Sequence, residues 1–560
     1  MSADMLVEQL ERIASELGGS DHPAIRLDRP RDPAHGDLAT NLALVLGGRL
    51  GRSPHDVAAA IVDRLDLMSA GVAAAEIAGP GFINFRLATE RLHGALKQIL
   101  AAGNAFGRST AGKGRRTVVE FVSANPTGPL HVAHGRGAAL GDVIASLLEW
   151  RGEEVTREFY VNDAGVQVDR LAESLDARWR QLHGDDVPLP EGGYHGEYVA
   201  DLARAVDAQH GDRLVRMEPV ERIRFLRSWG VETLEAEQDR DLRDFGVCFD
   251  VWSSETDLYS TGKLEDTLRD LEAHGLTYTA DGATWLRTTA FSDDKDRVLV
   301  KSDGTYTYFL PDIAYHRDKA ARGFSHAINV WGADHHGYIP RMQAALAALG
   351  RKDFLDVEVV QMVRLMRGDV EVKLSKRAGN IVTLRELMDM VGRDVARYFF
   401  LMRRGDTQML FDLDLALDHS EKNPVYKVQY AHARMMSIFR KAGTDPDELR
   451  PGDIDLSRLG HETEHALIKQ LGAFPAVVEK SAAALAPHLV CEYLETTAGQ
   501  VNSWYHAGNP SRNPELAVLA TDAGLRSARL VLAAAIRTVL RNGLVLLGLN
   551  APERMERLEA

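Results

Sequence analysis

The sequence predicts a multidomain protein built around an α/β nucleotide-binding domain, with a small α+β domain before it and an α-helical bundle after it. Residues 117–122 form a β-branched run, which a turn at 125–129 and apolar residues at helical spacing follow. This strand–turn–helix order opens many nucleotide-binding folds. Alternating apolar and polar residues over 83–87 indicate an earlier, half-buried strand. Helical periodicity without strands beyond residue 405 indicates the bundle.

Length and composition limit the class of protein. A chain of 560 residues suggests about three to four domains, and 45% hydrophobic with 26% charged residues is typical of a globular protein. No apolar run approaches the ~20 residues of a membrane span, and the acidic N-terminus is unlike a secretory signal. Two distant cysteines, Cys248 and Cys491, argue against a disulfide framework or a cysteine zinc site. We therefore expect a cytoplasmic protein that does not bind membranes.

The net charge is −15, which argues against nonspecific binding to nucleic acid. A specific RNA partner stays possible, because basic residues can gather on one face of an acidic protein.

The first domain is predicted to span 1–108. Apolar residues at helical spacing over 6–17 mark its first helix, and 77–87 reads as strand, turn and strand. A linker rich in Gly, Lys and Arg at 103–116 ends it.

The turn after the strand at 117–122 carries two histidines, His131 and His134. Three residues apart at a helix start, they share one face of the helix. A helix N-terminus attracts phosphate, and two imidazoles beside it suggest a site where a phosphate develops charge. Histidines near a turn are more often surface or capping residues, so the pair alone leaves both interpretations open.

Two later stretches are candidates for the same site. Residues 327–332 read as a buried strand that ends at Asp334-His335-His336, and ligands of open α/β sheets bind at such strand ends. Adjacent residues on a strand point to opposite faces, so we expect no metal site there. Tyr308 and Asp312 lie four apart, and both would face one pocket if a helix begins near Pro311.

The nucleotide-binding domain is predicted to span 109–404, with a charged, mostly helical insertion at about 167–290. Near its end, Lys373 and Lys376 flank Ser375 in a cationic loop suited to a polyphosphate, although most lysine-rich loops are solvated surface. Residues 383–386 fit a capping box, so a helix follows the loop directly.

Taken in order, these motifs resemble those of arginyl-tRNA synthetases, a family of class I aminoacyl-tRNA synthetases. His131-Val132-Ala133-His134 resembles the HIGH motif, with Ala133 where Gly is usual. VKLSKRAGN at 372–380 resembles the KMSKS motif with both lysines in place. EFVSANPTGPLH at 120–131 and YVNDAG at 160–165 are similar to family segments.

The flanking regions carry the resemblance to both ends of the chain. HGDLATNLAL at 35–44 and EIAGPGFINFRL at 76–87 resemble the family's N-terminal additional domain, which contacts the tRNA elbow. Residues 423–434 and 547–555 resemble its helical anticodon-binding domain, here 405–560.

The resemblance implies a Rossmann-like class I catalytic domain and an ATP-dependent arginine–tRNA ligase. Such an enzyme forms arginyl-adenylate from L-arginine and ATP, releases pyrophosphate, and transfers arginine to the 3′-terminal adenosine of its tRNA. The resemblance further implies Mg²⁺ with ATP, no protein-bound zinc, arginine tRNA as partner, a monomer, and arginine activation that requires tRNA.

Residue roles follow from the same resemblance. The catalytic residues would be His131, His134, Lys373 and Lys376. The ATP site would add Val132, Ala133 and Ser375. The arginine site would use Asp312 and Glu255 for the guanidinium, Tyr308 against its face, Glu120, Asn125 and His131 for the amino and carboxylate groups, and Asp334 for a further polar contact. The tRNA would contact Tyr430, Arg434 and Met555.

Three alternatives stay open. Another class I synthetase is the nearest, but cysteine specificity would call for zinc-binding cysteines, and isoleucine, leucine or valine specificity for a large editing insertion. A small-molecule nucleotidylyltransferase would not need the long helical region. A non-catalytic tRNA-binding paralogue would not need the histidines and lysines that this chain retains.

Overall fold

The computed structural model describes residues 2–18, 24–28, 30, 32–372, 382–509 and 511–555. The chain forms two compact units. The first comprises Met1–Phe106, Arg434–Ala473 and Gly499–Val539, and the second comprises Gly107–Ala433, Phe474–Ala498 and Leu540–Ala560.

The first unit begins with the predicted α+β fold. Three antiparallel strands in the order β1-β3-β2 pack against three helices through one apolar core. The strands are β1 (Leu38–Thr40), β2 (Val72–Ala78) and β3 (Phe82–Leu87), and the helices are α1 (Ser2–Gly18), α2 (Leu42–Leu50) and α3 (Pro54–Arg64). Ile83 and Phe85 of β3 are fully buried and pack in this core, so the predicted strand–turn–strand is confirmed.

The rest of the first unit is helical. It contains α4 (Thr89–Ala102), α17 (Glu462–Gly472) and parts of α16 (Pro424–Ala442), α19 (His488–Ala507) and α20 (Ala523–Leu546). From Asp418 to Met555 the described residues form helices and their connections, which confirms the predicted α-helical region. None of the described helices combines the length and the apolar character needed to cross a bilayer.

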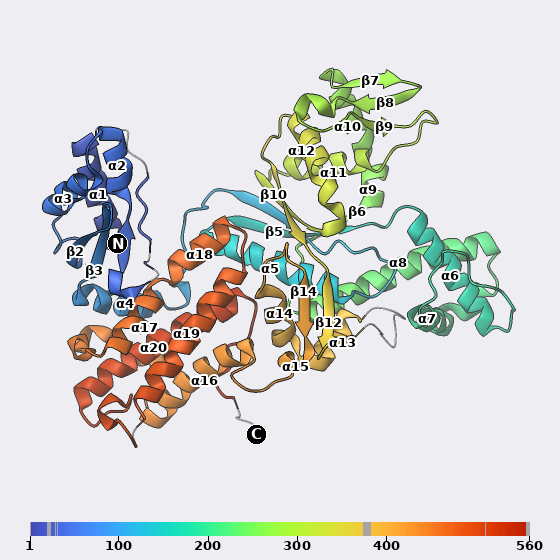
Figure 1. Cartoon of the computed structure of the whole chain (residues 1–560). Coiled ribbons are helices and arrows are strands. Elements are labelled where there is room, and N and C mark those ends of the chain that lie inside the picture. Colours follow the sequence, from blue (N-terminus) through green and yellow to red (C-terminus); the bar gives the residue numbers. More distant parts are fainter. Residues whose placement is uncertain are drawn as a thin grey trace. The chain divides into compact units, whose positions relative to one another are not determined.

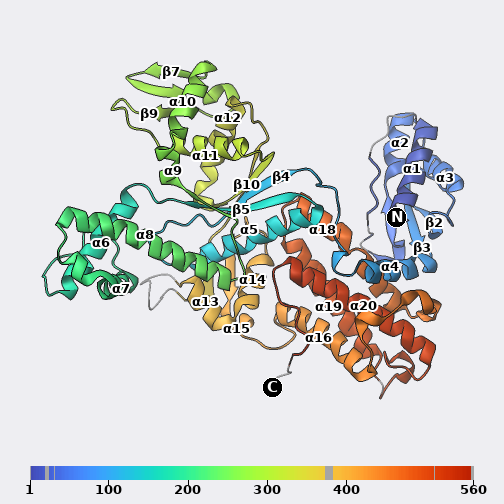
Figure 2. The same ribbon diagram turned by 180° about the vertical axis from the view of Figure 1, so that it is seen from behind.

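The second unit is organised by a five-stranded, all-parallel sheet in the order β11-β10-β4-β5-β6 (Figure 1). Its strands are β4 (Arg116–Glu120), β5 (Glu154–Val161), β6 (Val251–Ser254), β10 (His326–Gly332) and β11 (Leu355–Val360). The chain adds β5 and β6 on one side of β4, and then β10 and β11 on the other. Figure 2 labels β4 next to β10, where this direction of winding reverses. Ligands of such sheets bind at the carboxyl ends of the strands at the reversal.

The helix after β4 confirms the predicted strand–turn–helix. Helix α5 (Val132–Arg151) is buried along most of its length, and Gly152 ends it with φ of 97°. Gly141 allows α5 to lie against Phe121, because a Cβ there would come within 2.2 Å of that ring. The sheet and this helix thus fix where 121–131 can run.

A helical region separates β5 from β6. It consists of α6 (Val166–Leu182), α7 (Glu197–Leu214) and α8 (Pro219–Asp244), with an apolar core of its own. The predicted insertion at about 167–290 is therefore too long, because Tyr160 and Val161 of β5 pair with Ser253 and Ser254 of β6 in the central sheet. The segment that leaves the sheet and returns to it ends before Val251.

Between β6 and β10 lie α9 (Glu255–Ser260), α10 (Lys263–Ala273), the antiparallel strands β7 (Thr277–Ala280), β8 (Ala283–Leu286) and β9 (Arg297–Val300), and α11 (Phe309–Ala321). Helix α12 (Ile339–Ala348) then connects β10 to β11.

A further three-stranded sheet of the second unit, in the order β13-β12-β14, shows that the prediction that strands stop at residue 405 is wrong. Strand β14 (Met409–Asp412) pairs in parallel with β12 (Val363–Arg367), which also pairs with β13 (Val370–Glu371). Of the four residues of β14, only Met409 and Phe411 are buried. This alternation is too short to stand out in the sequence. Helices α13 (Leu384–Val391), α14 (Arg393–Leu401) and α15 (Leu413–Ala416) flank it in the chain, and α18 (Phe474–Ala483) completes the described helices of this unit.

Candidate active site

The two predicted histidines start helix α5 as a reciprocal cap. His131 is the N-cap residue, and its Nδ1 accepts from the backbone N–H of His134 at 3.4 Å. The Nδ1 of His134 accepts from the backbone N–H of His131 at 3.3 Å, and the rings stack with centroids 3.6 Å apart. The capping interpretation of these residues is therefore confirmed.

The cap leaves both rings with a donor for a ligand. Burial lowers the pKa of His134 to about 3 and also lowers the pKa of His131, so both imidazoles are neutral at pH 7. Since Nδ1 accepts in each ring, the remaining hydrogen is on Nε2. Capping uses Nδ1 of each ring and leaves Nε2 available to a ligand.

The predicted lysine motif, with Lys373, Ser375 and Lys376, lies outside the described residues. The chain that follows it lies beside the histidines. The N–H of Val132 donates to the carbonyl of Val382 at 3.2 Å, and that of Leu384 donates to Leu130 at 2.8 Å. Thr383 and Glu386 form the predicted capping box at the start of α13.

Glu120 ends β4 at the winding reversal and already has a cationic partner. It lies in register with Asn329 of β10 and Glu158 of β5. Lys319 Nζ lies 2.5 Å from Glu120 Oε2 and 3.1 Å from Asn329 Oδ1, in a fully buried position on α11. The sequence analysis missed Lys319, although its place seven residues after Asp312 puts both near one face of α11.

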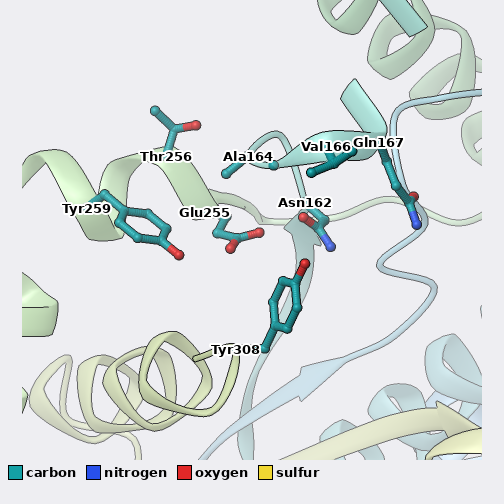
Figure 3. A pocket seen from close by; sticks show the side chains of 9 residues that line it. Asn162, Ala164, Val166, Gln167, Glu255, Thr256, Tyr259 and Tyr308 are labelled. Carbon is teal, nitrogen blue, oxygen red and sulfur yellow. The ribbon is translucent and has the colours of Figure 1, made fainter. Parts of the chain in front are cut away.

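A cavity of about 500 Å³ opens beside this edge of the sheet (Figure 3). Two predicted arginine-site residues, Glu255 and Tyr308, line it. The remaining lining comes from the end of β5, the start of α6, and α9: Asn162, Ala164, Gly165, Val166, Gln167, Thr256 and Tyr259. Tyr308 precedes α11 and is 83% exposed, with its hydroxyl directed toward Asn162.

Glu255, which lines this cavity, and Asp312 lie close enough for the charge of one to influence the other. Burial raises the pKa of Glu255 to about 7, and the negative charge of Asp312 adds to the shift. Burial also raises the pKa of Asp312 to about 7, against a hydrogen bond of 2.5 Å that Tyr338 donates to it. Tyr259 is hydrogen-bonded to Glu255, toward which its hydroxyl points. Carboxyls held in this way are suited to a ligand that brings a positive charge.

Asn125 connects the histidine loop to the cavity. Its Nδ2 donates to Oε1 of the lining residue Gln167 at 2.6 Å. Asp334 behaves differently, since its side chain is 80% exposed, pairs with His335 at 3.4 Å and does not line the cavity. Within the described ranges, no group of three or more His, Cys, Asp or Glu is arranged to hold a metal ion.

The predicted tRNA-contacting residues lie in and after the helical region. Tyr430 stacks on Tyr426 in α16 with ring centroids 5.7 Å apart. Arg434 is buried and donates to the side chain of Asn502. Met555 is half-buried at the end of the described chain.

Three family models match successive parts of the chain. The arginyl tRNA synthetase N terminal domain matches residues 4–87, the catalytic domain of class I tRNA synthetases (R) matches 95–408, and the DALR anticodon binding domain matches 428–555. The chain belongs to the bacterial arginyl-tRNA synthetase family.

Relatives in this family cover the whole chain. The arginine–tRNA ligase of Geobacillus kaustophilus is 48% identical over 99% of both chains, and that of Bacillus subtilis is 44% identical over the same shares. The arginyl-tRNA synthetase structure from Thermus thermophilus gives a TM-score of 0.77 at 25% identity, covering 99% of this chain and 100% of the other. A methionyl-tRNA synthetase from Mycobacterium tuberculosis, 14% identical over 77% of this chain and 91% of its own, reaches only 0.51 and shows the shared fold alone.

Proposed function

We propose that the crevice at the carboxyl ends of β4 and β10 is where this ATP-dependent arginine–tRNA ligase forms arginyl-adenylate. An arginine carboxylate oxygen attacks the α-phosphorus of ATP, the bond from that phosphorus to the β-phosphate oxygen breaks, and pyrophosphate leaves. The 2′-hydroxyl of the terminal tRNA adenosine, following the class I pattern, then attacks the arginyl carbonyl carbon and AMP leaves.

The histidine cap supports the first step. The two Nε2–H groups of His131 and His134 would donate to oxygens of the α- and β-phosphates, where negative charge grows in the transition state. Val132 and Ala133 would lie along the nucleotide. Lys373, Ser375 and Lys376 are proposed to close over the leaving pyrophosphate, and Val382 and Thr383 tie the chain that follows them to the histidines.

The acidic cavity supports arginine as substrate. Glu255 and Asp312 would accept from the guanidinium while Tyr308 packs on its face. Glu120, Asn125 and His131 would hold the amino and carboxylate groups, and Asp334 would add a polar contact. Lys319 already binds Oε2 of Glu120, so we expect Oε1, which accepts from the Ser123 hydroxyl at 3.1 Å, to face the substrate.

The remaining proposals concern partners and compartment. Tyr430, Arg434 and Met555 would contact arginine tRNA, and 1–108, 109–404 and 405–560 would act as its elbow-binding, catalytic and anticodon-binding regions. Mg²⁺ would enter with ATP and neutralise phosphate charge, held by the phosphates without a dedicated protein cage or bound zinc. A cytoplasmic monomer is proposed; the two free thiols support the compartment, because they fit a reducing environment.

One observation carries the choice of amino acid: Glu255 lines a cavity together with the exposed Tyr308, and Asp312 lies close enough to add to the raised pKa of Glu255. ATP–pyrophosphate exchange across the amino acids, with and without arginine tRNA, tests it. We expect exchange with arginine only, and only when tRNA is present. Exchange with another amino acid, and none with arginine plus its tRNA, would overturn the proposal.

A further inference from the structure

The loop that carries the histidines leaves β4 in a strained conformation. Val122 and Ser123 have φ of 68° and 41°, in the left-handed region that a β-branched residue such as Val122 rarely adopts. Such strain persists only where surrounding contacts hold the backbone in place.

Ser123 is held by Glu120 and Tyr160 of the sheet, and the helical region between β5 and β6 binds the residues that follow it in the loop. Gln238 of α8 donates to the carbonyls of Asn125 at 3.1 Å and Gly128 at 2.9 Å. Tyr198 of α7 donates to the carbonyl of Thr127 at 2.8 Å, and Gln167 of α6 accepts from the Asn125 amide. All three helices of the insertion therefore bind the few residues that lead into the histidine motif.

The buried position of Gln238 leaves one end of its amide without a hydrogen bond to any residue that the structure describes. It is 1% exposed, and among the described residues its Oε1 is buried without a hydrogen-bond partner. An unpaired buried oxygen is unfavourable, so the contribution of this side chain lies in the two carbonyls that its Nε2 holds.

Helix α8 also holds the chain that follows the lysine motif. Asp241, one turn beyond Gln238, accepts from Nε and Nη2 of Arg385 at 3.0 and 2.7 Å, and Asp244 accepts from the same Nη2 at 2.6 Å. Arg385 lies in the first turn of α13. Both views of the molecule show α8 running from α7 toward α13 (Figures 1 and 2).

We infer that Gln238 and Asp241 are positioning residues for adenylation. From one face of α8 they hold the histidine loop and the start of α13 in a fixed position relative to each other. The inference rests on the proposed function, because it assumes that the two motifs act on one ATP. The relative position of the two motifs matters, because misplacement of reacting groups by about 1 Å costs on the order of 100-fold in rate. The insertion is then part of the catalytic apparatus and not only a folded appendage.

The test measures ATP–pyrophosphate exchange with arginine and arginine tRNA, with kcat expressed per titrated active site. Gln238→Met keeps the length of the side chain and removes the donor, and we expect kcat to fall about 10- to 100-fold while the KM for arginine changes less than about threefold. Asp241→Asn should lower kcat about tenfold, and Asp241→Glu should restore most of it. In the double variant the fall in kcat should be smaller than the product of the two single falls, because both changes disturb the same relative position of the loop and α13.

Asp239→Asn is the matched control. It makes the same substitution on the same helix, but its partner is Arg243, one turn along α8 and facing solvent. This variant should keep the kcat of the unaltered chain. Thermal unfolding of all variants distinguishes a loss of folded protein from a misplacement of the two motifs.

Unaltered kcat per active site in both Gln238→Met and Asp241→Asn, or an equal loss in Asp239→Asn, would overturn the inference. If Gln238→Met does not fold, Asp241→Asn against Asp241→Glu decides. Absence of exchange by the unaltered chain would instead overturn the proposed function, and the positioning role with it.

Discussion

Two glutamates at the carboxyl edge of the central sheet are almost equally buried and yet in opposite electrostatic situations. Glu120 ends β4 and is 6% exposed, and Glu255 follows β6 and is 7% exposed. Glu120 has Lys319 at 2.5 Å. Glu255 has no salt bridge with any described residue and faces Asp312, which raises its pKa with burial. Burial alone does not distinguish the two glutamates; the internal cation beside Glu120 does.

The largest expected effect comes from removing the internal cation. Lys319→Met should lower the free energy of unfolding by about 3–5 kcal/mol, because it leaves the Glu120 carboxylate buried and unpaired. Chemical denaturation measures this. The double variant Lys319→Met with Glu120→Gln should recover much of the loss, and a single variant as stable as the parent would show that Glu120 does not depend on this partner.

Removing the carboxylate that lacks a cation should instead affect the substrate. Glu255→Gln should raise the KM for arginine at least about 30-fold with little change in unfolding free energy, because its proposed partner is the guanidinium of the substrate. Exchange kinetics with arginine tRNA measure this. A loss of stability as large as that of Lys319→Met, with an unchanged KM, would remove the contrast between the two glutamates.

The same contrast predicts a pH dependence of arginine binding. The guanidinium stays protonated, and Glu255 and Asp312 are proposed to bind it in their charged forms, which dominate above their pKa values of about 7. Affinity for arginine should therefore fall as pH drops below about 7, by up to about tenfold per unit for each proton taken up. Without arginine the sign reverses: raised carboxyl pKa values make the free protein lose stability as pH rises toward 7. Calorimetric titration of arginine binding and thermal unfolding, each between about pH 5.5 and 8.5, test these two pH dependences. Glu255→Gln should flatten both profiles.

The smallest expected effect is at Tyr308. Tyr308→Ala should raise the KM for arginine about three- to tenfold through loss of cation–π contact, and Tyr308→Phe should retain most of the affinity. Equal losses in both would assign the contribution to the hydroxyl, which points toward Asn162.

Local patterns were predictable from the sequence, and long-range pairings were not. The end of α5 at Gly152 and the capping box at Thr383 depend on neighbours within one helical turn. Lys319 pairs with Glu120, 199 positions earlier in the chain, only because the fold brings α11 to the end of β4. Strands β6 and β14 have four residues each, too few for a periodic signal, so the insertion was predicted too long and the last strand was missed.

The contacts of the histidine loop were equally hidden. Gln238 lies in a charged helix without any motif, and its role depends on two backbone carbonyls, which every residue has. The family resemblance identified Asn125, but only the fold shows which side chains orient it.

The reciprocal cap of His131 and His134 makes the two rings mutually dependent. Each ring supplies the acceptor that its neighbour's backbone needs, so replacing one removes part of the helix cap together with a proposed phosphate donor. Asparagine, a good N-cap residue, would repair the first loss without the second. A single asparagine at the N-cap position His131 is therefore expected to keep the helix start and to lose only the Nε2–H of that ring.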